Sequence, residues 1–389
     1  MDNGKSMLIY ASAPVEKTTF VPATWSPLAE KTGIPGTEEA VINISRELDS
    51  SYPITITVVN LCGDEAGRYG GVQWIDARNF DPAQAPEFDV AFFLSHDAAI
   101  DCVRRGLKAE RLYLWMENQP PEAEVLPYMG NVFHKIMPLT SWSRSCYPNI
   151  PDHQIFRTRN GVNLKDIDRY LDTPRQRHRL VYGSDYDRGL SILLKNWPHI
   201  KQQFPAAELD VFYGWNIFDS KTERVADPTQ RAQRLEYKAM INQLFEQPGV
   251  HHHGRVSHQD VARLFCQADV WAYPCLFPES SCITAMKAQI AGAIPVVIPT
   301  GALKDTVIFG YKTTQDGDNW VTLSAQAKQQ CMQEWFAYLF KAMADDASSA
   351  EMRTTMQAQT RDYFSWKTIA AEWAQEILST QQTPSMVIF

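Results

Sequence analysis

The segment 277–297 (FPESSCITAMKAQIAGAIPVV) combines the residues best suited to binding an anionic sugar derivative. Glu279 lies in a loop after an apolar run, and Ser280, Ser281 and Cys282 open a predicted helix. The free N–H groups and the dipole at a helix N-terminus bind anions, and the serine hydroxyls could donate to a diphosphate. Glu279 could accept hydrogen bonds from sugar hydroxyls. The pattern equally suits two serine N-caps beside a solvated carboxylate.

Two further loops could approach a phosphate. In GIPGTEEAV (33–41), Gly33 and Gly36 would let the backbone come close to a ligand, although a plain turn with a helix cap also explains the pattern. In SDYDRGL (184–190), Arg188 follows a predicted strand and could pair bidentately with phosphate. An arginine at such a place can also be an ordinary surface residue.

Other residue patterns that suggest catalysis have simpler explanations. Asp185 and Asp187, like Asp316 and Asp318, have the spacing of a DxD metal motif, but aspartate is also favoured in turns. The histidine run 251–253 lacks partners at zinc-like spacing. No serine lies in a GxSxG elbow, which argues against a serine hydrolase. We therefore expect no bound metal.

The composition is that of a soluble globular protein. The chain has 389 residues, 44% of them hydrophobic and 21% charged, and its net charge of -8 argues against a broad nucleic-acid or anionic-membrane surface. Its seven scattered cysteines indicate reduced thiols. The sequence shows no signal-peptide pattern and no apolar run of about 18 residues. We expect a cytoplasmic protein, at most peripheral to a membrane.

Two successive series of apolar runs alternate with helical patterns, which predicts an α/β protein with two doubly wound parallel sheets. The predicted strands are 7–12, 54–61, 89–95, 111–116 and 135–140, then 178–184, 207–214, a run ending at Val250, 269–274 and 293–299. The polar stretch 163–177 is the expected boundary. The expected domains are 1–165, 175–363 and a C-terminal helix with its tail, 364–389.

Two predicted helices have a clear apolar face. In the first, Val41, Ile44 and Leu48 share a face, Thr37 is the expected N-cap, and two glutamates occupy the first turn. The second covers 364–379 and should dock onto a larger body. Its apolar positions are Trp366, Ile369, Ala370, Trp373 and Ile377.

Six segments in order resemble the family 4-like retaining glycosyltransferases of GT-B fold (glycosyl transferases group 1). They are GIPGTEEAV, RNGVN, SDYDRGL, ELDVFYGW, GRVSHQDVARLFCQADVWAYP and ESSCITAMKAQIAGAIPVV, the last typical of a subgroup with an ESSCITAMKAQ-type donor loop. The resemblance covers nearly the whole chain. It implies two Rossmann-like domains facing a cleft, with the acceptor on the N-terminal side, the donor on the C-terminal side, and a last helix that crosses back to the first domain.

The resemblance also implies roles by position. Arg188 matches the basic phosphate-binding residue, and Glu279 matches the first glutamate of an E-x7-E motif, which usually holds sugar hydroxyls. Arg255 and Val256 would lie by the base. The implied catalytic residues are Glu279, Arg188 and Glu117, and the implied donor-binding residues are Gly36, Arg188, Arg255, Val256, Glu279, Ser280, Ser281, Cys282, Ile283 and Lys287.

The chain departs from the family pattern at two places. Lys287 replaces the second glutamate of the motif, and it has three donors and no acceptor for a ribose hydroxyl. It could instead add positive charge to a phosphate pocket or pair with a structural acid. Glu117-Asn118 stands where relatives often have His-Asp, and a carboxylate there could bind a sugar or acceptor hydroxyl.

These features predict transfer of a sugar, with retention and without metal or cofactor, from a nucleoside-diphosphate sugar to an acceptor hydroxyl. The acceptor would be a glycan, a lipid-linked molecule or a protein, and nucleic acid is not expected as a partner. The alternatives are a sugar-nucleotide epimerase or phosphorylase on the same fold, or a binding module that has lost catalysis.

Overall fold

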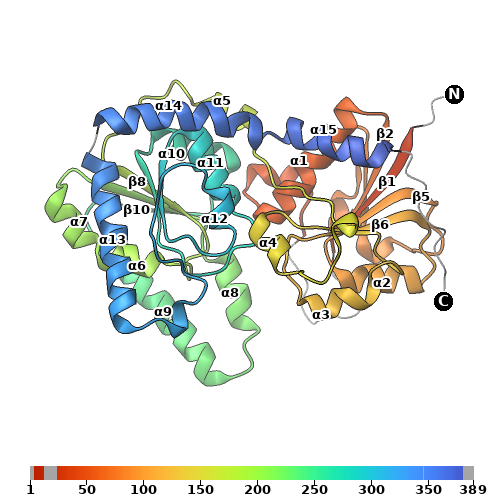
Figure 1. Ribbon diagram of the computed structural model, residues 1–389, viewed down its shortest axis with the longest axis horizontal. Helices are drawn as coiled ribbons and strands as arrows, with labels where there is room; N and C mark the ends of the chain where they lie inside the picture. Colours follow the sequence, from red (N-terminus) through yellow and green to blue (C-terminus); the bar gives the residue numbers. More distant parts are fainter. Residues whose placement is uncertain (1–3, 13–23, 345, 380–389) are drawn as a thin grey trace. The chain divides into compact units, whose positions relative to one another are not determined.

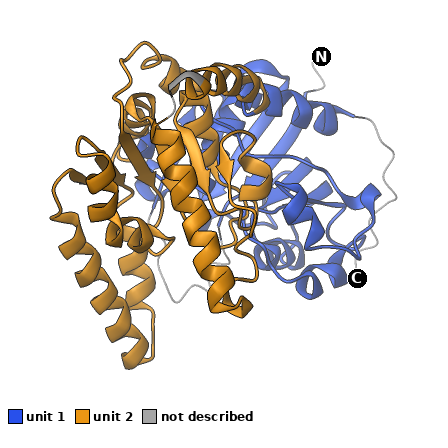
Figure 2. Ribbon diagram, turned by 60° about the vertical axis from the view of Figure 1, so that its left-hand side comes forward, with its two compact units in different colours: residues 1–30, 34–163, 364–389 blue, residues 31–33, 164–363 orange. Residues whose placement is uncertain are grey.

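The computed structural model describes residues 4–12, 24–344 and 346–379, and the chain forms two compact units (Figures 1 and 2). The first unit comprises 1–30, 34–163 and 364–389, and the second comprises 31–33 and 164–363. The tail expected at 380–389 lies outside the described residues. No helix among the described residues is both long enough and apolar enough to cross a membrane.

The first unit is built on a seven-stranded sheet with the order β3-β4-β2-β1-β5-β6-β7. Its strands are β1 (Lys5–Tyr10), β2 (Ile54–Asn60), β3 (Gly67–Tyr69), β4 (Val72–Asp76), β5 (Phe88–Phe93), β6 (Ala109–Trp115) and β7 (Lys135–Met137). The five strands predicted in this unit are confirmed. The sequence analysis missed β3 and β4, which form a short antiparallel pair in a polar, glycine-containing stretch without a sustained apolar run.

The helices of the first unit cover this sheet and connect its strands. They are α1 (Gly36–Ser51), α2 (His96–Arg104), α3 (Glu122–Val125), α4 (Ser141–Ser145) and α15 (Trp366–Leu378). In α1 the predicted face of Val41, Ile44 and Leu48 is fully buried. The prediction of Thr37 as its N-cap is wrong. Pro35 occupies the N-cap with an extended backbone, and its fixed φ lets the helix begin at Gly36.

Helix α15 belongs to the first unit although it follows the whole of the second in sequence. It packs on α1, and its predicted apolar positions are all buried, which confirms the amphipathic pattern. The Trp373 ring lies 4.8 Å from that of Phe92 and 4.9 Å from that of Trp115, and its indole N–H donates to Thr158 Oγ1 at 2.7 Å. Aromatic packing therefore anchors this helix on the first sheet.

The second unit is built on a fully parallel sheet with the order β10-β9-β8-β11-β12-β13. Its strands are β8 (Arg179–Gly183), β9 (Glu208–Phe212), β10 (Val250–Gly254), β11 (Val270–Tyr273), β12 (Ile294–Val297) and β13 (Tyr311–Lys312). The strand predicted to end at Val250 begins there, because the histidine run pairs with β9 despite its polarity. The two-residue β13 was too short to predict.

Ten helices described in the second unit surround that sheet (Figure 1). They are α5 (Leu164–Asp168), α6 (Leu190–Lys195), α7 (Trp197–Gln203), α8 (Asn216–Glu223), α9 (Pro228–Phe245), α10 (His258–Gln267), α11 (Ile283–Ala291), α12 (Leu303–Thr306), α13 (Ala325–Ala344) and α14 (Asp346–Tyr363). Helix α5 packs on α10, so it is part of this unit.

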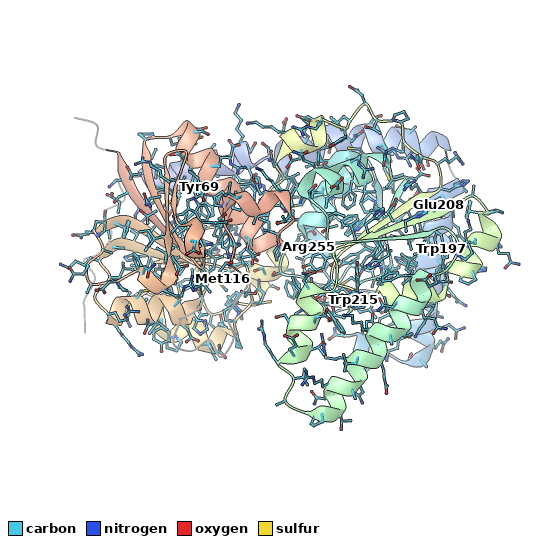
Figure 3. The ribbon with its side chains drawn as sticks, turned by 180° about the vertical axis from the view of Figure 1, so that it is seen from behind. Tyr69, Met116, Trp197, Glu208, Trp215 and Arg255 are labelled. Carbon is cyan, nitrogen blue, oxygen red and sulfur yellow. The ribbon has the colours of Figure 1, made fainter. Side chains whose placement is uncertain are left out.

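Apart from β3, both sheets have the Rossmann strand order, in which the first and fourth strands are neighbours. This confirms the predicted class of two doubly wound α/β domains. The order of connection reverses between β1 and β5 in the first sheet and between β8 and β11 in the second. Figure 3 shows Glu208 at the amino edge of the second sheet and Arg255 toward its carboxyl edge. Ligands of such sheets bind beyond the carboxyl edge, at the point of reversal.

Candidate functional site

Arg188 and Glu279 meet at the point of reversal of the second sheet. Arg188 lies in the loop after β8, and Glu279 lies in the loop after β11. Arg188 Nη1 donates to both carboxylate oxygens of Glu279, at 2.7 and 2.6 Å. Two residues 91 positions apart thus form a charged pair at the edge where the sequence analysis expected a ligand.

Two aromatic residues contact this ion pair. Glu279 is only 6% exposed, and the buried Tyr273 donates to its Oε1 at 2.6 Å. The guanidinium carbon of Arg188 lies 4.3 Å from the centre of the Phe277 ring. Burial by itself would lower the pKa of Arg188, but the Glu279 carboxylate raises this pKa well above its usual range. The arginine is therefore a permanent positive charge at the sheet edge.

Helix α11 begins beside this pair with an N-terminus that no side chain caps. Its N-cap is Cys282, which makes no capping bond, so the alternative in which the serines are N-caps is wrong. The first turn of α11 contains no acidic residue. Thr284 Oγ1 donates to Gly183 O at 3.0 Å, which fixes the first turn of the helix against the end of β8. The dipole end of the helix thus lies next to β8 and can attract an anion.

The remaining residues expected on this helix differ in exposure. Ser280 and Ser281 are half-buried, whereas Cys282 and Ile283 are buried. Among the described residues, Ser281 Oγ is a buried atom without a hydrogen-bond partner, so it can still bond to a ligand. Lys287 is half-buried, three residues after Thr284 and thus on the same face of the helix.

Arg255 and Val256 follow β10, at the same edge of the second sheet. Arg255 donates from Nε to Gly33 O and from Nη1 to Tyr213 O, both at 3.3 Å. Gly33 has a φ of +83°, and a Cβ there would lie 2.3 Å from Val256 O. Glycine is thus required at position 33 for a close packing contact; of the two explanations of this loop, approach to a ligand and a plain turn, this contact favours the structural one.

Glu117 lies just after β6 in the first unit, 7% exposed. Burial and the charge of Glu38 raise its pKa to about 8, although hydrogen bonds from Asn160 and Thr37 favour the charged form. The Asn160 amide donates to Glu117 Oε2 at 3.2 Å. At neutral pH Glu117 therefore carries a proton and can donate a hydrogen bond.

Gly36, also in the first unit, is the first residue of α1, whose N-terminus has no side-chain cap.

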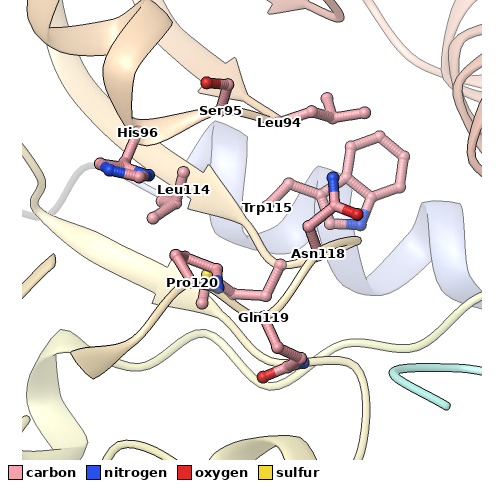
Figure 4. Close-up of a pocket in the computed structure, with 9 residues that line it drawn as sticks. Leu94, Ser95, His96, Leu114, Trp115, Asn118, Gln119 and Pro120 are labelled. Carbon is pink, nitrogen blue, oxygen red and sulfur yellow. The ribbon is translucent and has the colours of Figure 1, made fainter. Parts of the chain in front are cut away.

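A cavity of about 420 Å³ opens at the carboxyl edge of the first sheet (Figure 4). Its walls come from the segment after β5, the last two residues of β6 and the segment that follows: Leu94, Ser95, His96, Leu114, Trp115, Met116, Asn118, Gln119 and Pro120. The sequence analysis named Asn118 but missed Ser95, His96 and Gln119. Their positions at or shortly after the ends of two predicted strands were a usable signal, because strand ends at this edge are where ligands bind.

The residues that resembled metal motifs make structural contacts. Asp185 accepts from Lys221 Nζ at 2.8 Å. Asp316 and Asp318 accept from Lys304 Nζ at 2.9 and 2.6 Å. Over the described ranges of the chain, no group of three or more His, Cys, Asp or Glu side chains is arranged to hold a metal ion. Asp185, Asp316 and Asp318 are thus engaged by lysine side chains.

Comparisons with known proteins agree with this geometry. Residues 178–326, within the second unit, match the family model of glycosyl transferases group 1. No curated protein matches the chain. The match and the fold together support a relationship of this chain to the group 1 glycosyltransferases.

Several solved structures share the fold at low sequence identity. A glycosyltransferase from Rickettsia africae is 13% identical with a TM-score of 0.66, and 97% of this chain and 100% of that one are covered. Anabaena HepE, in complex with UDP and glucose, is 14% identical with a TM-score of 0.64 and coverage of 96% and 99%. Sucrose-phosphate synthase from Thermosynechococcus elongatus is 13% identical, with a TM-score of 0.64 and coverage of 96% and 98%. The chain thus has the GT-B fold.

Proposed function

We propose that this chain, whose second unit matches the group 1 glycosyltransferases, transfers a sugar from a nucleoside-diphosphate sugar to an acceptor hydroxyl. The observation that carries the proposal is the meeting of Arg188, Glu279 and the uncapped start of α11 at the reversal point of the second sheet. A cation and free helix N–H groups suit a diphosphate, and a carboxylate suits sugar hydroxyls.

In the proposed reaction, the acceptor hydroxyl oxygen forms a bond to the sugar carbon as the bond between that carbon and the diphosphate breaks. Negative charge develops on the departing diphosphate, which takes up the hydroxyl proton. Arg188 and the N–H groups of α11 stabilise that charge, with Ser281 Oγ as a further donor. Lys287, one turn into the helix, adds a positive charge in place of the family's ribose-binding glutamate. We propose retention of configuration, with no metal ion or cofactor, in keeping with the family that the sequence resembles.

We assign the acceptor to the cavity of the first unit. Asn118 and Gln119 offer amide groups, and His96 offers a ring nitrogen, for binding hydroxyls on a glycan, lipid-linked or protein acceptor. Leu94 and Pro120, the half-buried apolar residues of the lining, supply an apolar surface for a sugar ring. Glu117, which stands in the sequence between the lining residues Met116 and Asn118, donates or accepts a hydrogen bond according to its protonation.

A thermal-shift screen with UDP, GDP, ADP and their sugars tests the donor class. A diphosphate at 100 times its Kd should stabilise the folded state by about 2.7 kcal/mol. The identified donor is then incubated with sugar and glycan acceptors while nucleotide release is measured. Glu279→Ala should abolish transfer, whereas the control Glu87→Ala changes an exposed side chain of the first unit and should keep it.

Two outcomes would contradict this function. If Glu279→Ala retained wild-type transfer, the assignment of the donor site would be wrong. If nucleotide sugars bound but no acceptor led to nucleotide release, a binding module without catalysis would be the better description of the protein.

A further inference from the structure

Glu279 is held from one side by Arg188 and from the other by Tyr273, and this arrangement assigns a role to the tyrosine. We propose that Tyr273 is a positioning residue of the donor site: its hydroxyl fixes the Glu279 carboxylate, which in turn aims Arg188 at the diphosphate. This inference rests on the proposed function, because it assumes that Arg188 binds the donor phosphates.

Tyr273 has a rigid setting. It is the last residue of β11, which lies between β8 and β12 in the sheet, and it is fully buried. Its hydroxyl oxygen lies 2.6 Å from Glu279 Oε1 and 2.9 Å from Ser184 Oγ. A carboxylate can only accept, so the phenol proton is donated to Glu279. The sheet thereby holds one carboxylate oxygen in a defined place.

The contact between Glu279 and Arg188 leaves most of the guanidinium available. Both carboxylate oxygens bind the same nitrogen, Nη1. In the described part of the chain, Nε and Nη2 of Arg188 make no hydrogen bond. A guanidinium has five N–H donors in a fixed plane, so three of them remain for a ligand. The Phe277 ring lies 4.3 Å away and further restricts that plane.

The direction of these free donors therefore depends on Glu279, and the orientation of Glu279 depends on Tyr273. Without the phenol hydroxyl, the carboxylate could rotate and Arg188 would turn with it. The arginine would keep its charge but lose its alignment with the phosphates. Bidentate phosphate binding is sensitive to such a rotation, whereas simple charge attraction is not.

The experiment compares Tyr273→Phe with a matched control, Tyr113→Phe. Tyr113 is also buried, and its hydroxyl also donates to a glutamate, Glu376, at 2.5 Å, but it lies in the first unit. The probe is whichever of UDP, GDP or ADP the thermal-shift screen selects, titrated by calorimetry. We expect Tyr273→Phe to raise the Kd about tenfold, as for a lost charge-assisted hydrogen bond, and the control to leave it unchanged.

A double-mutant cycle without ligand separates positioning from a merely structural role. The variants are Tyr273→Phe, Arg188→Lys and their combination, made in the natural chain and again with Glu279→Gln. In the natural chain, we expect the combined effect of the two substitutions on the unfolding equilibrium constant to differ about fivefold from the product of their separate effects. With Glu279→Gln this difference should disappear. Because both side chains bond to the Glu279 carboxylate, loss of the coupling with Glu279→Gln is the signature of positioning through that carboxylate.

The outcomes are distinguishable. Additive effects of the two substitutions, or an unchanged diphosphate Kd in Tyr273→Phe, would overturn the positioning role while the proposed function stands. If the natural chain bound none of the three diphosphates, the proposed function would fail, and the positioning role would fail with it. Should Tyr273→Phe not fold, Ser184→Ala removes the other contact of the phenol and should raise the same Kd by a smaller factor.

Discussion

Replacing Glu117 with glutamine should remove a specific pH dependence from the stability of the protein. The carboxyl is buried beside Glu38, and its pKa rises from 4.5 to about 8 in the folded state. Between these two pH values, the unfolded chain has lost the proton while the folded protein keeps it. The free energy of unfolding therefore falls as pH rises through this window, and the loss is complete above about pH 8.

The size of the effect follows from the two pKa values. At about 1.4 kcal/mol for each pH unit between them, the full change is about 5 kcal/mol. The part that falls between pH 6 and pH 8 is about 2 kcal/mol, because the slope flattens near the upper pKa. Glutamine carries no titrating proton, and its amide oxygen can still accept from Asn160. The variant should therefore lack this slope.

Urea denaturation at pH 6, 7 and 8 measures the difference. The stability of the natural protein minus that of Glu117→Gln should fall by about 2 kcal/mol over this range. Glu87→Gln, at an exposed position, serves as the control and should leave the slope in place. Glu38→Gln should shift the fall to lower pH by removing a neighbouring negative charge. A constant difference between the natural protein and Glu117→Gln would refute the buried, protonated state.

Three further substitutions test the packing around the site by chemical denaturation. Trp373→Ala should lower the free energy of unfolding by about 3–5 kcal/mol, because it leaves a cavity where α15 packs on the first sheet. A decrease below about 1 kcal/mol would contradict that packing. Gly301→Ala places a Cβ 2.7 Å from backbone atoms of Glu279, at a φ of +56° that alanine rarely adopts. It should lower the free energy of unfolding by more than about 1 kcal/mol and weaken diphosphate binding. Wild-type diphosphate binding would count against the importance of this contact. Gln289 is fully buried and accepts from the part-buried backbone N–H groups of Ile308 and Phe309. Gln289→Leu removes this acceptor and should cost about 1–2 kcal/mol, whereas an unchanged midpoint would show that water replaces it.

Much of the fold was predictable because its signals are local. An apolar run indicates a buried strand wherever it lies, and a period of 3.6 residues indicates the buried face of a helix. These rules found nine of the strands in place and the face of α15. They failed where local chemistry contradicts the fold: at β3 and β4, which lack a sustained apolar run, and at β10, whose histidines form a strand because β9 pairs with it.

The candidate site was only partly predictable. Arg188 and Glu279 were identified because each follows a predicted strand. The cavity in the first unit was missed at Ser95, His96 and Gln119, since a position at a strand end is visible in the sequence but the direction of the side chain is not. Gly33 was noted for the right property, its freedom to approach other atoms closely. The atom that it approaches is Val256 O, more than two hundred residues along the chain.

What the sequence determined by itself was the type of each element and the residue types at the strand ends, since both depend on neighbours within a few positions. Only the tertiary structure decided how those residues are used. The adjacency of β8 and β11 brings Arg188 to Glu279, and burial makes Tyr273 the partner of that carboxylate and Glu117 a protonated acid. Pairing and desolvation depend on atoms that are distant in sequence, so the charge state and direction of these groups are properties of the folded chain.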